Sequence, residues 1–84
     1  MILEIYKHPK NDAVKEYYVY ALNRVNNDDI WYFSYDIKSI IQMYKTRDFR
    51  FTKEESRVYN LDFISSKEYK NIEEIEFEYM HKLI

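Results

Sequence analysis

Four glutamates near the end of the sequence form its densest set of side chains that could do acid–base chemistry. They are Glu73, Glu74, Glu76 and Glu78. A catalytic carboxylate pair needs an acid and a base with separated pKa values, and no residue beside these four indicates such a difference. Their spacing also matches no calcium-binding loop. We therefore expect an acidic surface that is either solvated or bound to a basic groove on a partner protein.

The remaining candidates for catalysis are two histidines and a few serines, and none of them stands in a recognisable motif. His8 and His81 lie far apart in sequence and cannot close a structural zinc site alone. The chain has no cysteine and no glycine, which excludes thiolate metal sites and the glycine-dependent loops that hold phosphates. The sequence thus predicts a protein that is not an enzyme and that has neither a cofactor nor a metal site.

A cluster of basic residues in the region 38–57 supports an alternative function, the binding of nucleic acid. The cations that would contact phosphates are Lys38, Lys45, Arg47, Arg50 and Lys53. Aromatic side chains between them could stack on bases. Acidic residues interrupt the cluster, however, and no known nucleic-acid-binding signature accompanies it. A mixed-charge surface is the simpler interpretation, and direct binding of nucleic acid is the less favoured function.

Length and composition indicate a single small globular domain that spans residues 1–84. Hydrophobic residues make up 46% of the chain, aromatic residues 19% and charged residues 33%, with a net charge of −2. This net charge gives no general attraction to DNA or to membranes. No apolar stretch reaches membrane-spanning length and no signal peptide begins the sequence, so we expect a cytoplasmic protein that does not bind membranes. Without glycine, asparagine and aspartate are expected to occupy any turn position that requires a positive φ.

The first half of the sequence predicts an antiparallel meander followed by a helix. Strands are expected at 2–8, 15–25 and 30–36, and the polar run 26–29 between the last two is typical of a hairpin turn. Asp36 can cap the helix expected at 37–47, in which Ile37, Ile40, Ile41 and Tyr44 form one apolar stripe.

The second half is less clearly patterned. Thr52 and Glu55 fit a capping box for one helical turn, and the alternation from Val58 to Ile64 predicts a fourth strand at about 57–64. Ser65 and Glu68 fit another capping box, which favours a helix over 66–73. Residues 74–83 fit either a helix or an edge strand. The sequence therefore predicts an α+β fold in the order β-β-β-α-β-α, with an antiparallel sheet of about four strands and helices packed on one face.

The hairpin of the second and third strands is aromatic on both faces. Core packing accounts for one face, and the other either meets the end of the chain or stays exposed. Tyrosine and tryptophan are common anchors of protein interfaces. The hairpin residues that we predict to bind a partner are Tyr17, Tyr20, Trp31 and Tyr35. A homodimer through this face or through a strand edge is a further possibility.

The composition resembles that of small proteins encoded by AT-rich bacteria, their phages and their plasmids. Many such proteins block a host or defence protein stoichiometrically. By this analogy alone we expect a non-enzymatic protein-binding module that acts as an inhibitor, comparable to an anti-CRISPR protein. The aromatic hairpin and the four glutamates would together bind a partner, possible partners including a protein that handles nucleic acid through a basic groove.

Overall fold

The chain folds into an antiparallel sheet with helical segments on both of its faces. The computed structural model describes residues 1–9, 18–24, 29–47 and 50–80. Its elements, in order, are β1 (Ile2–Lys7), β2 (Tyr18–Asn23), β3 (Trp31–Ser34), α1 (Ile37–Thr46), β4 (Arg50–Phe51), α2 (Lys53–Ser56), the 3₁₀ helix η1 (Val58–Asn60), β5 (Asp62–Glu68) and α3 (Ile72–Met80). The predicted α+β class is confirmed, with five strands in place of about four.

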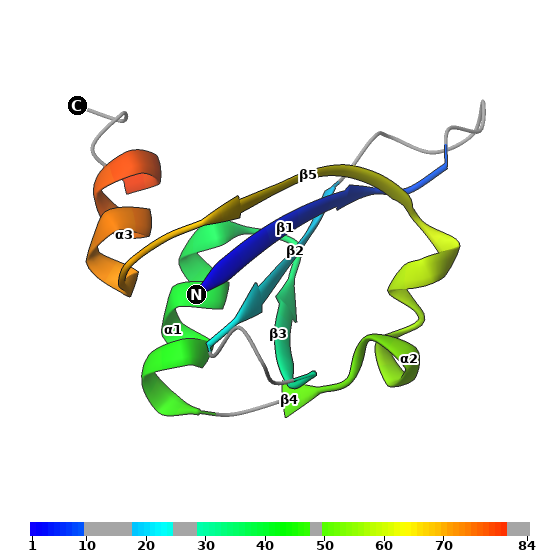
Figure 1. Ribbon diagram of the computed structural model, residues 1–84, viewed down its shortest axis with the longest axis horizontal. Coiled ribbons are helices and arrows are strands. Elements are labelled where there is room, and N and C mark those ends of the chain that lie inside the picture. The colour runs from blue at the N-terminus through cyan, green and yellow to red at the C-terminus, as the bar shows by residue number, and fades with distance from the viewer. Residues whose placement is uncertain (10–17, 25–28, 48–49, 81–84) are drawn as a thin grey trace.

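The strands lie in the order β4-β3-β2-β1-β5, and every neighbouring pair is antiparallel. β2 and β3 form the predicted hairpin, with Tyr20 opposite Ser34 and Asn23 opposite Trp31. β1 lies between β2 and the last strand, β5, which occupies an edge of the sheet (Figure 1). The register of β1 and β5 shifts between Ile5 and Tyr6, where β5 contains one extra residue.

The first face of the sheet carries the larger core, which α1 and α3 close. α1 begins as predicted at Asp36, whose carboxylate accepts hydrogen bonds from the backbone N–H and the hydroxyl of Ser39. Ile40 of α1 and Ile75 of α3 are completely buried. The buried residues of this core are Leu3, Leu22, Tyr32, Ile37, Ile40, Ile41, Tyr69, Ile72 and Ile75. Full burial of an isoleucine side chain contributes about 1.5–3 kcal/mol, so these two helices supply much of the stability.

The second face is covered by the short α2–η1 segment. Thr52 and Glu55 form the predicted capping box: the Glu55 N–H donates to the Thr52 hydroxyl at 3.1 Å, and the Thr52 N–H donates to the Glu55 carboxylate at 3.0 Å. Hydrogen bonding of the Glu55 carboxylate to the Thr52 backbone N–H, and next to the Thr52 side chain, lowers the pKa of Glu55. The smaller core on this face consists of Tyr6, Ala21, Trp31 and Val58. Helical structure therefore lies on both faces of the sheet, with the two long helices, α1 and α3, together on the first.

The boundaries expected after residue 57 are wrong. Ser65 and Glu68 do not cap a helix, because both lie in β5, which pairs with β1 over its whole length. The last helix begins at Ile72 instead, after Asn71, whose side chain accepts a hydrogen bond from the Glu74 N–H at 3.1 Å. Helix continues to Met80, so the strict alternation of residues 74–79 does not form a strand.

Two arginines adopt the left-handed backbone conformation that glycine usually supplies. Arg47 ends α1 and Arg57 ends α2, each with a φ of 60°. In both positions the backbone N–H donates to a carbonyl of the preceding helix, which is a common way to end a helix. Within the described residues, arginine rather than asparagine or aspartate thus takes the positive-φ positions of this glycine-free chain.

Candidate partner-binding surface

Lys53 holds the α2–η1 segment against the second face of the sheet. Its ammonium lies 2.6 Å from the Glu4 carboxylate and 4.4 Å from the centre of the Trp31 ring. The Tyr6 hydroxyl donates to the same carboxylate at 2.7 Å. Burial and this hydrogen bond to Glu4 raise the pKa of the Tyr6 phenol, so Tyr6 remains a donor throughout the ordinary pH range. Lys53, Glu4, Tyr6 and Trp31 thus form one polar and aromatic cluster.

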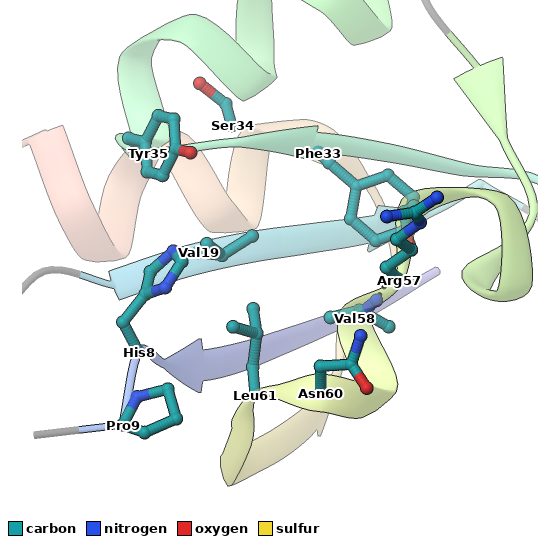
Figure 2. Close-up of a pocket in the computed structure, with 11 residues that line it drawn as sticks. His8, Pro9, Val19, Phe33, Ser34, Tyr35, Arg57, Val58, Asn60 and Leu61 are labelled. Carbon is teal, nitrogen blue, oxygen red and sulfur yellow. Dashed lines mark hydrogen bonds between the residues drawn. The ribbon is translucent and has the colours of Figure 1, made fainter.

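A pocket of about 470 Å³ opens beside this segment, between it and strands β2 and β3. Figure 2 shows Leu61 and Val58 on one side and Val19 on the sheet side, with His8 and Tyr35 at the end away from Arg57 and Phe33. The His8 and Tyr35 rings stack with their centres 6.3 Å apart. The described residues that line it are His8, Pro9, Val19, Phe33, Ser34, Tyr35, Ser56, Arg57, Val58, Asn60 and Leu61. Among these residues the lining is therefore mainly apolar, and its permanently charged member is the cation Arg57.

Apolar side chains of η1 and of the edge strand β5 are exposed. Tyr59 is 69% exposed, Phe63 57% and Ile64 50%. The Phe63 ring meets the buried Tyr6 ring edge-on, with ring centres 5.6 Å apart, so Phe63 is anchored at its base while its outer part faces solvent. We call these three residues with the outer edge of β5 the β5 surface.

The backbone of β5 also presents hydrogen-bonding groups along this edge. The Met1 ammonium donates to the Tyr69 carbonyl at 2.9 Å, and the Tyr69 N–H donates to the Met1 carbonyl at 2.8 Å. Residues of an antiparallel strand alternate between facing one neighbour and facing the other. Because Tyr69 faces the β1 side, Ser66 directs its N–H and C=O groups toward the outer edge of the sheet.

The structure separates the aromatic residues that were predicted to bind a partner. Trp31 is only 6% exposed, because it lies under Lys53, and Tyr20 packs against the first core. Burial raises the pKa of the Tyr20 phenol. Tyr35 is 66% exposed at the pocket. Tyr17 lies outside the described residues. Of the described members, Tyr35 is the one with a largely accessible ring.

The four glutamates of the predicted acidic surface all lie on α3, but they differ in their contacts. Glu76 forms an ion pair with Lys45 of α1 at 3.1 Å. Glu78 binds Lys67 at 2.9 Å and accepts a hydrogen bond from the Tyr69 hydroxyl. The contact with Glu78 raises the pKa of Lys67. Glu73 and Glu74 are exposed, and Glu74 accepts a hydrogen bond from the Lys70 N–H. Two of the four glutamates thus form ion pairs within the protein.

The basic residues of the alternative function do not share one surface. Lys45 points to α3 on the first face of the sheet, whereas Lys53 lies against the second face. Lys38, Arg47 and Arg50 are exposed. A single strand of nucleic acid would have to pass around the sheet to meet all five.

The sequence did not reveal the pocket or the β5 surface. The strand predicted at about 57–64 includes Tyr59 and Phe63, whereas η1 carries Tyr59 and β5 begins at Asp62. Phe63 and Ile64 are exposed because β5 lies at an edge of the sheet. The order of strands in a sheet cannot be read from the sequence around one strand.

No group of three or more histidine, aspartate or glutamate residues within the described chain could hold a metal ion. Nor does the described part contain a helix long and apolar enough to cross a membrane. Comparison with protein families, with curated proteins and with solved structures gives no match.

Proposed function

We propose that this chain is a non-enzymatic protein-binding module, and that its partner docks on the β5 surface. The observation that carries the proposal is the exposure of Tyr59, Phe63 and Ile64 beside the open edge of β5. Aromatic and aliphatic anchors surrounded by polar groups are the usual centre of a protein interface.

The arrangement favours an extended segment of the partner over a globular face. Such a segment can add to the sheet as a sixth strand and accept and donate hydrogen bonds at Ser66. At the other end of β5, Phe63 and Ile64 would contact its apolar side chains. The exposed charge of Asp62 lies at the start of β5 and would help to set the register of the added strand.

Two expectations from the sequence remain predictions beside this proposal. One is the more specific role of a stoichiometric inhibitor of a host or defence protein. The other is nucleic-acid binding through the region 38–57, which has less support because Lys45 and Lys53 lie on opposite faces of the sheet.

Affinity capture from a bacterial lysate with the purified chain tests the proposal. The informative variant is the double substitution Phe63→Glu and Ile64→Glu, which places two charges on the β5 surface. The matched control is Phe77→Glu, because Phe77 is similarly exposed, at 68%, but lies on α3. We expect the double variant to lose the captured partner at least tenfold and the control to retain it.

Circular dichroism must show that both variants are folded like the unmodified chain. Light scattering on the pure protein detects the competing outcome, in which the β5 surface joins two copies of this chain. Partners that bind equally well to the double variant, or that are lost only with Phe77→Glu, would contradict the proposal.

A further inference from the structure

We infer that the pocket between the α2–η1 segment and strands β2 and β3 is a binding site for a small aromatic carboxylate. Its volume of about 470 Å³ falls within the range of about 300–1,000 Å³ typical of small-molecule sites. This site is separate from the β5 surface, so the inference does not depend on the proposed function.

The apolar lining selects the body of the ligand. Val19, Phe33, Val58 and Leu61 give the pocket aliphatic and aromatic walls. The stacked rings of His8 and Tyr35, inclined at 25° to each other, add aromatic surface at one end (Figure 2). A flat aromatic body of one or two rings matches these walls better than a branched aliphatic or a sugar, because ring faces and edges pack closely on other rings.

The charge of the lining selects the polar group. Arg57 contributes a guanidinium, and none of the described residues that line the pocket is an aspartate or glutamate. Within the described parts of the chain, no ion pair or side-chain hydrogen bond of Arg57 is found. A guanidinium binds a carboxylate through two parallel hydrogen bonds, a geometry that a neutral amide cannot reproduce.

Arg57 is an exposed residue at the rim of the pocket, and its backbone is held in place there. Its left-handed backbone ends α2, and its N–H donates to the Glu54 carbonyl at 3.2 Å while its own carbonyl accepts from the Asn60 N–H at 3.1 Å. The backbone from which the guanidinium extends is thus fixed on both sides. Arg57 and the stacked rings lie at opposite ends of the pocket, so a ligand would place its carboxylate at one end and its aromatic body toward the other (Figure 2).

A pair of probes that differ only in charge tests the inference: naphthalene-1-acetate and its neutral isostere naphthalene-1-acetamide. Each is titrated into the full chain labelled with ¹⁵N and followed by NMR. We expect saturable binding of the carboxylate with a Kd of about 1 mM or tighter, and binding of the amide at least tenfold weaker. The shifted amide signals should belong to Val19, Phe33 and residues 57–61.

Substitutions at Arg57 test whether its charge binds the ligand, and NMR shows whether the fold is kept. Arg57→Gln should reduce the affinity for the carboxylate to that for the amide, about tenfold, whereas Arg57→Lys should retain part of the difference. Arg50→Gln is the matched control, because Arg50 is an exposed arginine on β4 that is not among the described residues lining the pocket. Unchanged NMR signals of α1 and α3 show that each variant is folded.

Four results would overturn the inference. They are no saturable binding at 10 mM probe, on the order of ten times the expected Kd, equal affinity for the two probes, no effect of Arg57→Gln, and shifted signals at Phe63, Ile64 or Phe77 in place of the pocket. The last result would mean that the probe binds exposed apolar side chains in general. None of these outcomes bears on partner capture by the β5 surface, which is measured without the probe.

Discussion

The two faces of the sheet are made from the same strands, yet they are closed in different ways. On the first face, α1 and α3 bring whole apolar stripes, and the described core there has nine buried residues. On the second face a short segment brings Val58 and a lysine, and the described core has four. The difference teaches that stability is concentrated on the first face, which leaves the second free to carry a pocket and exposed aromatic side chains.

The largest effect is expected when an aliphatic side chain is shortened on each face and the two losses of stability are compared. Ile40→Ala creates a cavity at a completely buried position of the first face and should lower the free energy of unfolding by about 2–5 kcal/mol. Leu61→Ala, at a half-buried position of the second face, should cost less than about 2 kcal/mol because solvent already reaches it. Urea denaturation measures both. Equal losses would show that the faces contribute alike.

An intermediate loss of stability is expected when Lys53, which packs on the second face, is replaced. Lys53→Met keeps the apolar stem of the side chain but removes both the ion pair with Glu4 and the contact with the Trp31 ring. Because the paired side chains are only 17% and 13% exposed, we expect a loss of about 1–3 kcal/mol, between the values for surface and buried pairs.

A double-mutant cycle with Glu4→Gln isolates the ion pair from the ring contact. Lys38→Met is the control, because Lys38 is an exposed lysine on α1, and it should change stability by less than about 0.5 kcal/mol. A Lys53→Met loss no larger than that of the control would refute the role given to Lys53.

The smallest effect comes from removing one hydroxyl on each face. Tyr6→Phe should lower stability by about 1–2 kcal/mol, because the Tyr6 hydroxyl donates to Glu4. On the first face, the buried Tyr32 hydroxyl has no hydrogen-bond partner among the described residues. Tyr32→Phe should therefore leave stability unchanged or raise it by up to about 1 kcal/mol. Thermal unfolding of the two variants compares them directly.

The pH dependence of stability provides a second test of the Tyr6 hydroxyl. Since the fold raises the pKa of Tyr6 above its ordinary value of 10.0, its contribution is fully present below pH 10.0 and is lost as the pH rises further. The Tyr6→Phe variant should thus lose less stability than the unmodified chain above pH 10. A steeper alkaline loss in that variant would argue against this assignment.

Local patterns predicted the parts of the fold whose signals lie within one element. Asp36 before an apolar stripe identified α1, and Thr52 with Glu55 identified the start of α2. The same capping pattern at Ser65 and Glu68 was misleading, because pairing with β1 outweighed the local preference for a helix. Asn71 does cap a helix, but Asn71 with Glu74 has the same spacing as Ser65 with Glu68, so the local pattern does not distinguish the two positions.

The candidate sites were less predictable than the fold because they depend on contacts between distant residues. Trp31 has the residue type of an interface anchor, but Lys53, 22 positions later, covers it. The same holds for Glu76 and Glu78, whose cations come from α1 and β5. The pocket joins His8, the β2–β3 hairpin and the residues around Arg57, and no sequence window contains all three.

The place of β1 between β2 and β5 has a consequence for the order of folding. Residues 1–47 contain the β1–β2–β3 meander and α1, so most of their contacts join neighbours in sequence and can form early. The second edge of β1 cannot pair until β5, about 60 residues later in the chain, has been made. Until then the first core also lacks Tyr69, Ile72 and Ile75. We expect the docking of β5 and α3 to be the slow step, and during synthesis the exposed edge of β1 would be the segment most in need of protection from aggregation.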